Sequence, residues 1–394
     1  MRVYASTKPD YVLPTDEALI FAGHEAGICY MREDFDAILH EDTEVTMRRV
    51  KGTIGSGHHS VLGHTSYCMI LEDVPKIIAM LLNNEHDYNA SEKSARYTKM
   101  RTGDEEQRLY EKWIAKFEKL IAETYPQMNP KSIRKLALEN ARYFISVFTP
   151  STTIGYTADL RQINYLIGWC EEMISRETYD DPFMKQLKPW LAELLNVLSP
   201  LNVPGLRDGK GRAFSLFAEM DYLKHAPCYE RKEHFGDTYC TNYVGTFSQL
   251  AQAQRHRTLW YEMRIPIPGV AQFFVPPIIR DESLKVEYLE DMRSLSAFFP
   301  QGMLVHINES GTAELFALKC EERLCGAAQL EVCLQTEETL QKYLKAVDPA
   351  TNPGYEHIYR LLKSYDGKTK CQFGHYSCDR PCPLGPQNAF TRLV

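Results

Sequence analysis

A stretch rich in proline, glycine and charge divides the 394-residue chain close to its midpoint. It covers residues 199–212 and reads Ser-Pro-Leu-Asn-Val-Pro-Gly-Leu-Arg-Asp-Gly-Lys-Gly-Arg. Such a composition interrupts helices and strands and is typical of a linker. The two remaining segments, 1–198 and 213–394, have ordinary domain size, and we expect each to fold around its own core.

The same order of segments recurs on both sides of this linker. A strand-like run is followed by an apolar helical run and then by a charged loop. These segments are 65–73, 77–82 and 84–97 in the first half, and 239–244, a helix from Thr246 and a loop from Arg255 in the second. The shared order favours an internal duplication of one domain that contains both helices and strands.

One further run in the first half predicts a long helix. Apolar and aromatic side chains between Tyr110 and Ile121 recur at steps of three and four residues. This period places them on one face of a helix, so we expect that face to pack against a core.

The charge balance argues against broad binding to nucleic acid. The chain carries 45 Lys and Arg against 52 Asp and Glu, a net charge of -7, so any anionic ligand must be bound by local arginines. No apolar run reaches the roughly 18 residues that a membrane span needs, and the first residues lack a signal-peptide core. We therefore expect a cytoplasmic protein that does not bind membranes.

Two loops carry groups suited to an anionic ligand. Arg255-His256-Arg257 places two guanidinium groups and an imidazole together, which suits phosphates or an electron-rich ring. Residues 89–97 offer hydroxyls, an arginine and closely spaced backbone amides, which suit a phosphate monoester. Each loop also has a purely structural explanation, as a solvated cationic helix end or as a turn rich in serine.

Taken together, these loops resemble the flavin-dependent thymidylate synthases, whose motif is R-H-R-x-x-S-x-N-E-x-S-x-R-Y. The chain holds this motif in two pieces, with the opening at 255–257 and the later positions at Glu92, Ser94, Arg96 and Tyr97. Gln252 belongs to the segment Gln252–Arg257 that carries the opening, and Arg142, at the end of Glu139–Arg142, is similar to the arginine that family members direct at the nucleotide phosphate. Three other segments are similar to family elements. They are His58–His64, similar to H-x-T-P-x-E-H; Asp159-Leu160-Arg161, similar to N-x-R; and Arg323–Val332, similar to R-x-x-x-x-A-Q-W-E-I.

The resemblance implies a role for each matching residue. The implied nucleotide-binding residues are Glu92, Ser94, Arg96, Tyr97, Arg142, Gln252 and Arg323. The implied flavin-binding residues are His58, Ser60, Arg161, Arg255, His256 and Arg257. Arg323 is also implied to be catalytic, because its guanidinium would stabilise negative charge that develops on the pyrimidine ring.

The implied reaction converts dUMP to dTMP, with methylenetetrahydrofolate as carbon donor and reduced FAD as hydride donor. NADPH is the implied source of electrons for the flavin. The fold implied is α+β, with two tandem domains, each an antiparallel sheet covered by helices, forming a pseudo-dimer. Family members are homotetramers with active sites between subunits, so two copies of this fused chain would form a pseudo-tetramer.

The surviving pieces of the motif are complementary. The flavin part remains in the second half and the phosphate part in the first, as expected if each half keeps one role in a shared site. Two alternatives stay open: a divergent flavoprotein that modifies another pyrimidine nucleotide, and a non-catalytic paralogue that only binds nucleotide or flavin.

The cysteines suggest a second kind of site. Three of the eleven fall in the tail at residues 371–383, a density more typical of a metal or cluster loop than of chance. With Cys320, the cysteines Cys371, Cys378 and Cys382 would supply four thiolates for zinc or an iron-sulfur cluster. Free thiols are the alternative.

Overall fold

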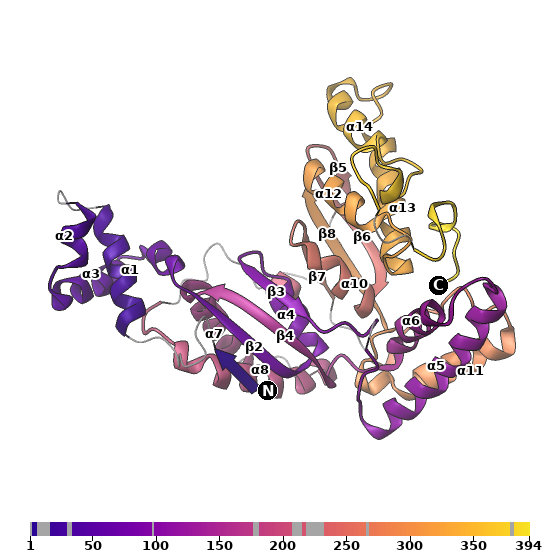
Figure 1. Ribbon diagram of the computed structural model, residues 1–394, viewed down its shortest axis with the longest axis horizontal. Coiled ribbons are helices and arrows are strands. Elements are labelled where there is room, and N and C mark those ends of the chain that lie inside the picture. Colours follow the sequence, from indigo (N-terminus) through magenta and orange to yellow (C-terminus); the bar gives the residue numbers. More distant parts are fainter. Residues whose placement is uncertain are drawn as a thin grey trace. The chain divides into compact units, whose positions relative to one another are not determined.

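The chain folds into two compact units (Figure 1). The structure, a computed structural model, describes residues 2–5, 16–29, 34–96, 98–175, 181–206, 215–217, 232–264, 268–378 and 382–394. Unit 1 contains the described parts of Met1–Lys93 and Pro150–Phe214, and unit 2 those of Ser94–Thr149 and Ser215–Val394.

Unit 1 is built on a four-stranded antiparallel sheet in the order β1-β2-β4-β3. The strands are β1 (Arg2–Ala5), β2 (Ser66–Pro75), β3 (Tyr88–Glu92) and β4 (Pro150–Asp159). Along β4 every second residue from Thr152 to Ala158 is buried, the period of a strand with one covered face. Two helices contact the sheet, α4 (Lys76–Asn83) and α7 (Leu160–Ser175), and α8 (Pro182–Leu198) packs against both of them. The remaining helices are α1 (Asp16–Ile28), α2 (Phe35–Leu39) and α3 (Thr43–Gly55).

Unit 2 contains a second four-stranded antiparallel sheet, in the order β5-β6-β8-β7. The strands are β5 (His234–Phe235), β6 (Thr238–Thr246), β7 (Trp260–Met263) and β8 (Leu304–Thr312). Its helices are α5 (Asp104–Thr124), α6 (Pro130–Ala141), α10 (Phe247–Ala253), α11 (Glu282–Ser294), α12 (Ala313–Arg323), α13 (Leu330–Ala346) and α14 (Glu356–Lys363). Figure 1 shows α10, α12 and α13 beside the sheet.

Short 3-10 helices connect these elements. They are η1 (His59–His64), η2 (Arg142–Phe144), η3 (Ser199–Leu201), η4 (Ser215–Phe217), η6 (Gln254–His256), η7 (Pro268–Val270), η8 (Ser296–Phe298), η9 (Pro353–Tyr355), η10 (Lys370–Gln372) and η11 (Pro386–Asn388).

The two sheets have the same strand order and the same sequence of elements. In each, the second strand leads into a helix, α4 or α10, and then into the third strand at one edge. In each, the fourth strand pairs between the second and third strands and leads into a pair of helices. The strands and helices predicted at 65–73, 77–82, 110–121, 239–244 and from Thr246 are confirmed, as is the α+β class.

Residues 94–149, which precede the sequence linker, pack within unit 2. Helices α5 and α6 form an antiparallel pair there, and Asn129 caps α6 by accepting a hydrogen bond from the Ser132 amide at 2.9 Å. Trp113 of α5 lies edge-on to Tyr288 of α11, with ring centroids 4.8 Å apart. Its indole Nε1 donates to Asp291 Oδ2 at 2.7 Å, so the aromatic contact and the hydrogen bond hold α5 to α11.

Backbone pairing fixes the end of this segment to the second half of the chain. The amide of Val147 donates to the carbonyl of Phe299 at 3.0 Å, and the amide of Gln301 to that of Ile145 at 2.8 Å. Gly302 completes the contact by donating to the Tyr143 carbonyl at 2.9 Å. A Cβ at Gly302 would lie 2.7 Å from the Tyr143 Cβ, so this approach requires glycine.

The described ranges contain no helix that is both long and apolar enough to cross a membrane.

Replacing Trp113 by alanine should destabilise unit 2 strongly. The side chain is fully buried, so its removal leaves a large cavity, and we expect a loss of about 3–5 kcal/mol in the free energy of unfolding. The control is Val286→Ala on α11, whose side chain is 53% exposed and should change stability by less than about 0.5 kcal/mol. Urea unfolding followed by circular dichroism measures both, and equal effects would contradict the packing described.

Candidate functional site

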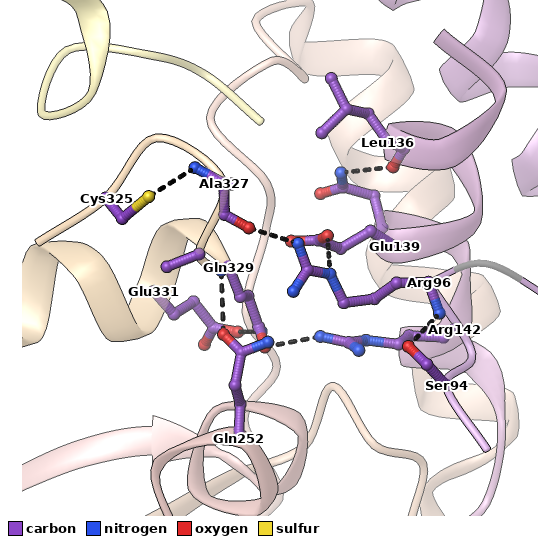
Figure 2. Close-up of polar contacts among 12 residues, drawn as sticks. Ser94, Arg96, Leu136, Glu139, Arg142, Gln252, Cys325, Ala327, Gln329 and Glu331 are labelled. Carbon is purple, nitrogen blue, oxygen red and sulfur yellow. Dashed lines mark hydrogen bonds and ion pairs between the residues drawn. The ribbon is translucent and has the colours of Figure 1, made fainter. Parts of the chain in front are cut away.

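Three arginines from distant parts of the sequence gather within unit 2, and Figure 2 shows two of them, Arg96 and Arg142. Arg96 follows β3, Arg142 begins η2 after α6, and Arg323 ends α12. The charge of Arg96 lowers the pKa of both other guanidinium groups, although burial lowers each of them more. We call Arg96, Arg142 and Arg323 the arginine cluster.

Arg96 joins the first half of the chain to the second. Its Nε donates to Glu139 Oε2 at 2.5 Å, and its Nη2 donates to the carbonyl of Ala327 at 2.5 Å. Its own backbone amide donates to the hydroxyl of Ser94 at 3.3 Å, which holds the local turn. Figure 2 shows the side chain pointing from this turn toward the loop at Ala327.

Arg142 contacts the same loop at Gln329, two residues after Ala327. Its Nη2 donates to Gln329 Oε1 at 2.5 Å, and the side chain is buried. The Gln329 amide nitrogen Nε2 donates in turn to Glu331 Oε1 at 2.6 Å and to the Tyr143 hydroxyl at 3.0 Å. The backbone amide of Gln329 donates to Gln252 Oε1 at 2.9 Å. Gln329 therefore uses its side chain and its backbone to connect Arg142 with α10.

Arg323 is tied to the same glutamine of α10. Its Nη2 donates to the carbonyl of Gln252. Burial, with smaller contributions from the nearby charges of Arg96 and Arg255, lowers the pKa of Arg323 to about 10. The loop that begins with Arg255 thus lies within electrostatic range of the arginine cluster.

Two buried carboxyl groups face the arginine cluster, and their pKa values shift in opposite directions. Burial raises the pKa of Glu139, but the charges of Arg96, Arg142 and Arg392 outweigh this and leave it lowered. Burial raises the pKa of Glu331 to about 7, despite hydrogen bonds from Tyr143 at 2.6 Å and from the α10 cap Thr246 at 2.9 Å. Near neutral pH, Glu139 is ionised and Glu331 is partly protonated.

The arginine cluster therefore carries more positive charge than its carboxyl groups balance. The charges of Arg96, Arg142 and Arg392 act on Glu139, which is ionised, and the charge of Arg142 acts on Glu331, which is partly protonated. Nε of Arg142 and Nε of Arg323 are buried and have no hydrogen-bond partner among the described residues. Excess buried positive charge and unused donors are unfavourable unless an anion binds, so this arrangement is suited to an anionic ligand.

Five residues implied by the sequence resemblance come together here, namely Ser94, Arg96, Arg142, Gln252 and Arg323. Glu92 lies in unit 1, where its carboxylate accepts from Lys76 at 2.6 Å and from Asn83 at 3.1 Å. Tyr97 lies outside the described residues. The sequence did not indicate roles for Glu139 and Tyr143, which lie close to Arg142 in the chain. It also did not indicate roles for Gln329 and Glu331, although both belong to the Arg323–Val332 segment.

The residues implied to bind flavin fall in both units. His58 and Ser60 are exposed near the start of η1, and Arg161 lies in the first turn of α7, all in unit 1. In unit 2, Arg255 and His256 belong to η6, and Arg257 follows in the left-handed region with φ of 53°. A positive φ is uncommon for a residue other than glycine, and Asp73 and Phe299 also adopt it among the described residues.

The predicted metal ligands do not assemble within the described residues. Cys320 is buried on α12, where burial raises the pKa of its thiol far above the ordinary value. Cys371 and Cys378 are exposed, and the Cys382 sulfur would lie 2.7 Å from a Cβ built on Gly326. No three His, Cys, Asp or Glu side chains in the described part of the chain lie close enough to hold a metal ion. The spacing of these cysteines in the sequence suggested a four-thiolate site. It could not show that Cys320 lies on the buried face of α12, whereas Cys371 and Cys378 are exposed.

Residues 12–168 match the family model described as thymidylate synthase complementing protein. This match confirms the resemblance to the flavin-dependent thymidylate synthase family and supports a thymidylate synthase-like function in general. The matched segment includes Arg96 and Arg142, two members of the arginine cluster. No curated protein matches the chain significantly.

Replacing Glu139 by glutamine should destabilise the protein, because it removes the one fully ionised carboxylate among these arginines. Removal of one partner from a buried ion pair costs about 3–5 kcal/mol in the free energy of unfolding. Glu111→Gln is the control, since Glu111 forms an exposed ion pair with Lys99. Urea unfolding measures both variants, and a Glu139 effect no larger than that of the control would contradict the charge balance described.

Replacing Glu331 by glutamine should remove a pH dependence of stability. The pKa of Glu331 is about 7 in the folded protein against an ordinary 4.5, so the folded state holds an extra proton between these values. Its contribution is therefore complete below about pH 4.5 and decreases as pH rises to about 7, by up to about 3 kcal/mol. Unfolding free energies at pH 5 and pH 8 should differ less in the variant, and an unchanged difference would contradict the assignment.

Proposed function

We propose that this chain is a flavin-dependent thymidylate synthase-like enzyme that methylates dUMP to dTMP, using methylenetetrahydrofolate and reduced FAD. The observation that carries the proposal is the arginine cluster, which joins the phosphate part of the family motif to the Arg323 segment in one buried, positively charged site. The match of residues 12–168 to the thymidylate synthase complementing protein family supports the same reaction class.

The phosphate of dUMP would bind to Arg96, Arg142 and Ser94. A guanidinium presents parallel donors that fit phosphate oxygens, and the Arg142 Nε has no other partner among the described residues. Phosphate binding would also neutralise the excess charge around Glu139. Binding energy gained at the phosphate would hold the pyrimidine ring in place, away from the reacting atoms.

The pyrimidine would lie against Arg323, held by the Gln252 carbonyl. As C5 of the ring becomes nucleophilic, negative charge develops on the ring oxygens, and a fixed guanidinium stabilises it without reorganisation. The lowered pKa of about 10 still leaves Arg323 cationic at neutral pH. This role needs no protein nucleophile.

The donor set of the Arg255–Arg257 loop is suited to FAD. Two guanidinium groups and a histidine lie in a turn, and Arg257 is exposed. When bound, FAD supplies the hydride that reduces the transferred carbon. Arg255 and Arg257 would hold its anionic groups and favour the negatively charged reduced form. NADPH is the proposed reductant.

We also propose that the chain arose by tandem duplication and acts as a pair of chains. The identical strand order of the two sheets supports the duplication. The complementary survival of the flavin motif in one half and the phosphate motif in the other supports a shared site. His58, Ser60, Glu92 and Arg161 would serve the flavin and nucleotide in the pair of chains, as in the family's tetramers.

Two variants should separate nucleotide binding from flavin binding. Arg96→Ala should weaken dUMP binding by about tenfold or more, because it removes a charged donor, and should leave FAD binding intact. Arg257→Ala should do the reverse. Isothermal titration with dUMP and flavin absorbance after FAD addition measure the two ligands. Arg108→Ala, which removes an exposed arginine paired with Glu105, is the control and should change neither.

If both variants lose the same ligand, the proposed division of roles is wrong. A wild-type protein that binds neither dUMP nor FAD would contradict the proposed function as a whole.

Growth of a thymidine-requiring cell on medium without thymidine tests the complete reaction. Expression of the wild-type chain should restore growth, and expression of Arg323→Met should not, because the methionine fills the space without charge. Binding of dUMP and FAD without restored growth would favour the non-catalytic paralogue over the enzyme.

A further inference from the structure

The loop between α12 and α13 places three consecutive carbonyl groups against arginine side chains. Residues 324–329 follow Arg323, the proposed pyrimidine contact, and end at Gln329, which accepts a hydrogen bond from Arg142. The middle carbonyl, that of Ala327, accepts from Arg96. The carbonyls on either side, those of Gly326 and Ala328, both accept from Arg392 near the C-terminal end of the chain.

Arg392 bridges these two carbonyls with the two ends of its guanidinium group. Nη1 donates to Gly326, and Nη2 donates to Ala328 at 2.6 Å. The residue is 4% exposed, and its Nε has no hydrogen-bond partner among the described residues. Hydrogen bonds from a buried cation are strong because water does not compete for the carbonyls.

The segment that carries Arg392 is itself anchored at several points. The Arg392 amide donates to the Asn388 carbonyl at 2.9 Å. The next residue, Leu393, donates through its amide to the Tyr125 hydroxyl at 3.0 Å and accepts from the Ile278 amide at 3.1 Å. Because its neighbour is held on both sides, Arg392 presents its guanidinium from a fixed backbone.

We propose that Arg392 is a positioning residue for the arginine cluster: it fixes the loop at 324–329 so that Ala327 meets Arg96 and Gln329 meets Arg142. The inference rests on the proposed function for the identity of the ligand, dUMP, whereas the contacts of Arg392 with the loop do not depend on that function. Arg392 lies outside every motif that carries the family resemblance, and outside the matched residues 12–168.

An arginine is required because the two carbonyls belong to residues 326 and 328 and must be held together. A guanidinium offers a planar fork of donors, whereas a lysine ammonium is a single point on a flexible stem. Arg392 acts on the cluster in a second way, since its charge lowers the pKa of Glu139 after the larger contributions of Arg96 and Arg142. A neutral residue at 392 would loosen the loop and also reduce the charge around Glu139.

The first test follows the loop without any ligand. Amide hydrogen exchange at Ala328 and Gln329 reports its closure, because these amides donate to the Cys325 carbonyl at 3.0 Å and to Gln252 at 2.9 Å. In Arg392→Met, two charged hydrogen bonds are lost, so exchange at these amides should become about tenfold faster or more. Arg392→Lys should give an intermediate rate.

The second test follows the nucleotide site. Arg392→Met should weaken dUMP binding by about tenfold and raise the KM for dUMP by a similar factor, while kcat should stay within about twofold, because binding geometry rather than the reacting atoms is affected. The lysine variant should recover part of the affinity. Arg360→Met on α14 is the control, since Arg360 is exposed and pairs with Glu356 one turn away.

The outcomes separate this inference from the proposed function. Exchange in both Arg392 variants at the wild-type rate overturns the positioning role, as does faster exchange with unchanged dUMP affinity. If Arg392→Met does not fold, the lysine variant decides by the same two criteria. A wild-type protein that binds no dUMP overturns the proposed function. In that case the comparison of hydrogen-exchange rates still tests whether Arg392 fixes the loop.

Discussion

The backbone pairing between residues 143–147 and 299–302 is the contact on which unit 2 depends. It holds the end of the α5–α6 segment against the second half of the chain, with Gly302 allowing the close approach to Tyr143. Arg142 immediately precedes the paired stretch, so the pairing also sets where its guanidinium can reach. Without this pairing, Gln329 would lose the hydrogen bond that it accepts from Arg142, and the arginine cluster would lack one of its three members.

The arginine cluster shows how burial and charge act against each other. Glu139 stays ionised because several guanidinium groups surround it, whereas Glu331 is partly protonated because its partners are mostly neutral donors. Glu331 can therefore organise Tyr143 and Gln329 without cancelling the positive charge of the site. That remaining charge, together with unused donors on Arg142 and Arg323, distinguishes the cluster from an ordinary buried ion-pair network.

Local sequence patterns predicted much of this structure, and long-range contacts decided the rest. The strand-helix order around 65–82 and 239–253 follows from periodicity, and the motifs identified Arg96, Arg142, Gln252 and Arg323. The apolar stripe on α5 predicted a helix on a core, but nothing in it indicates that this core lies in unit 2. Glu139 and Arg392 have no local signal, because their roles arise only when distant segments meet. The predicted site at Cys320, Cys371, Cys378 and Cys382 likewise depends on how distant segments meet, and these cysteines do not assemble within the described residues.

The hydrogen bond from Arg96 to the Ala327 carbonyl joins residues 231 positions apart. The first and second halves of the chain therefore share one selective constraint. A substitution that shifts the loop after α12 changes what is acceptable at position 96, and the reverse also holds. Neither half can drift freely under selection for the shared site, so compensating changes between the two halves should mark the history of this chain more than changes confined to one of them.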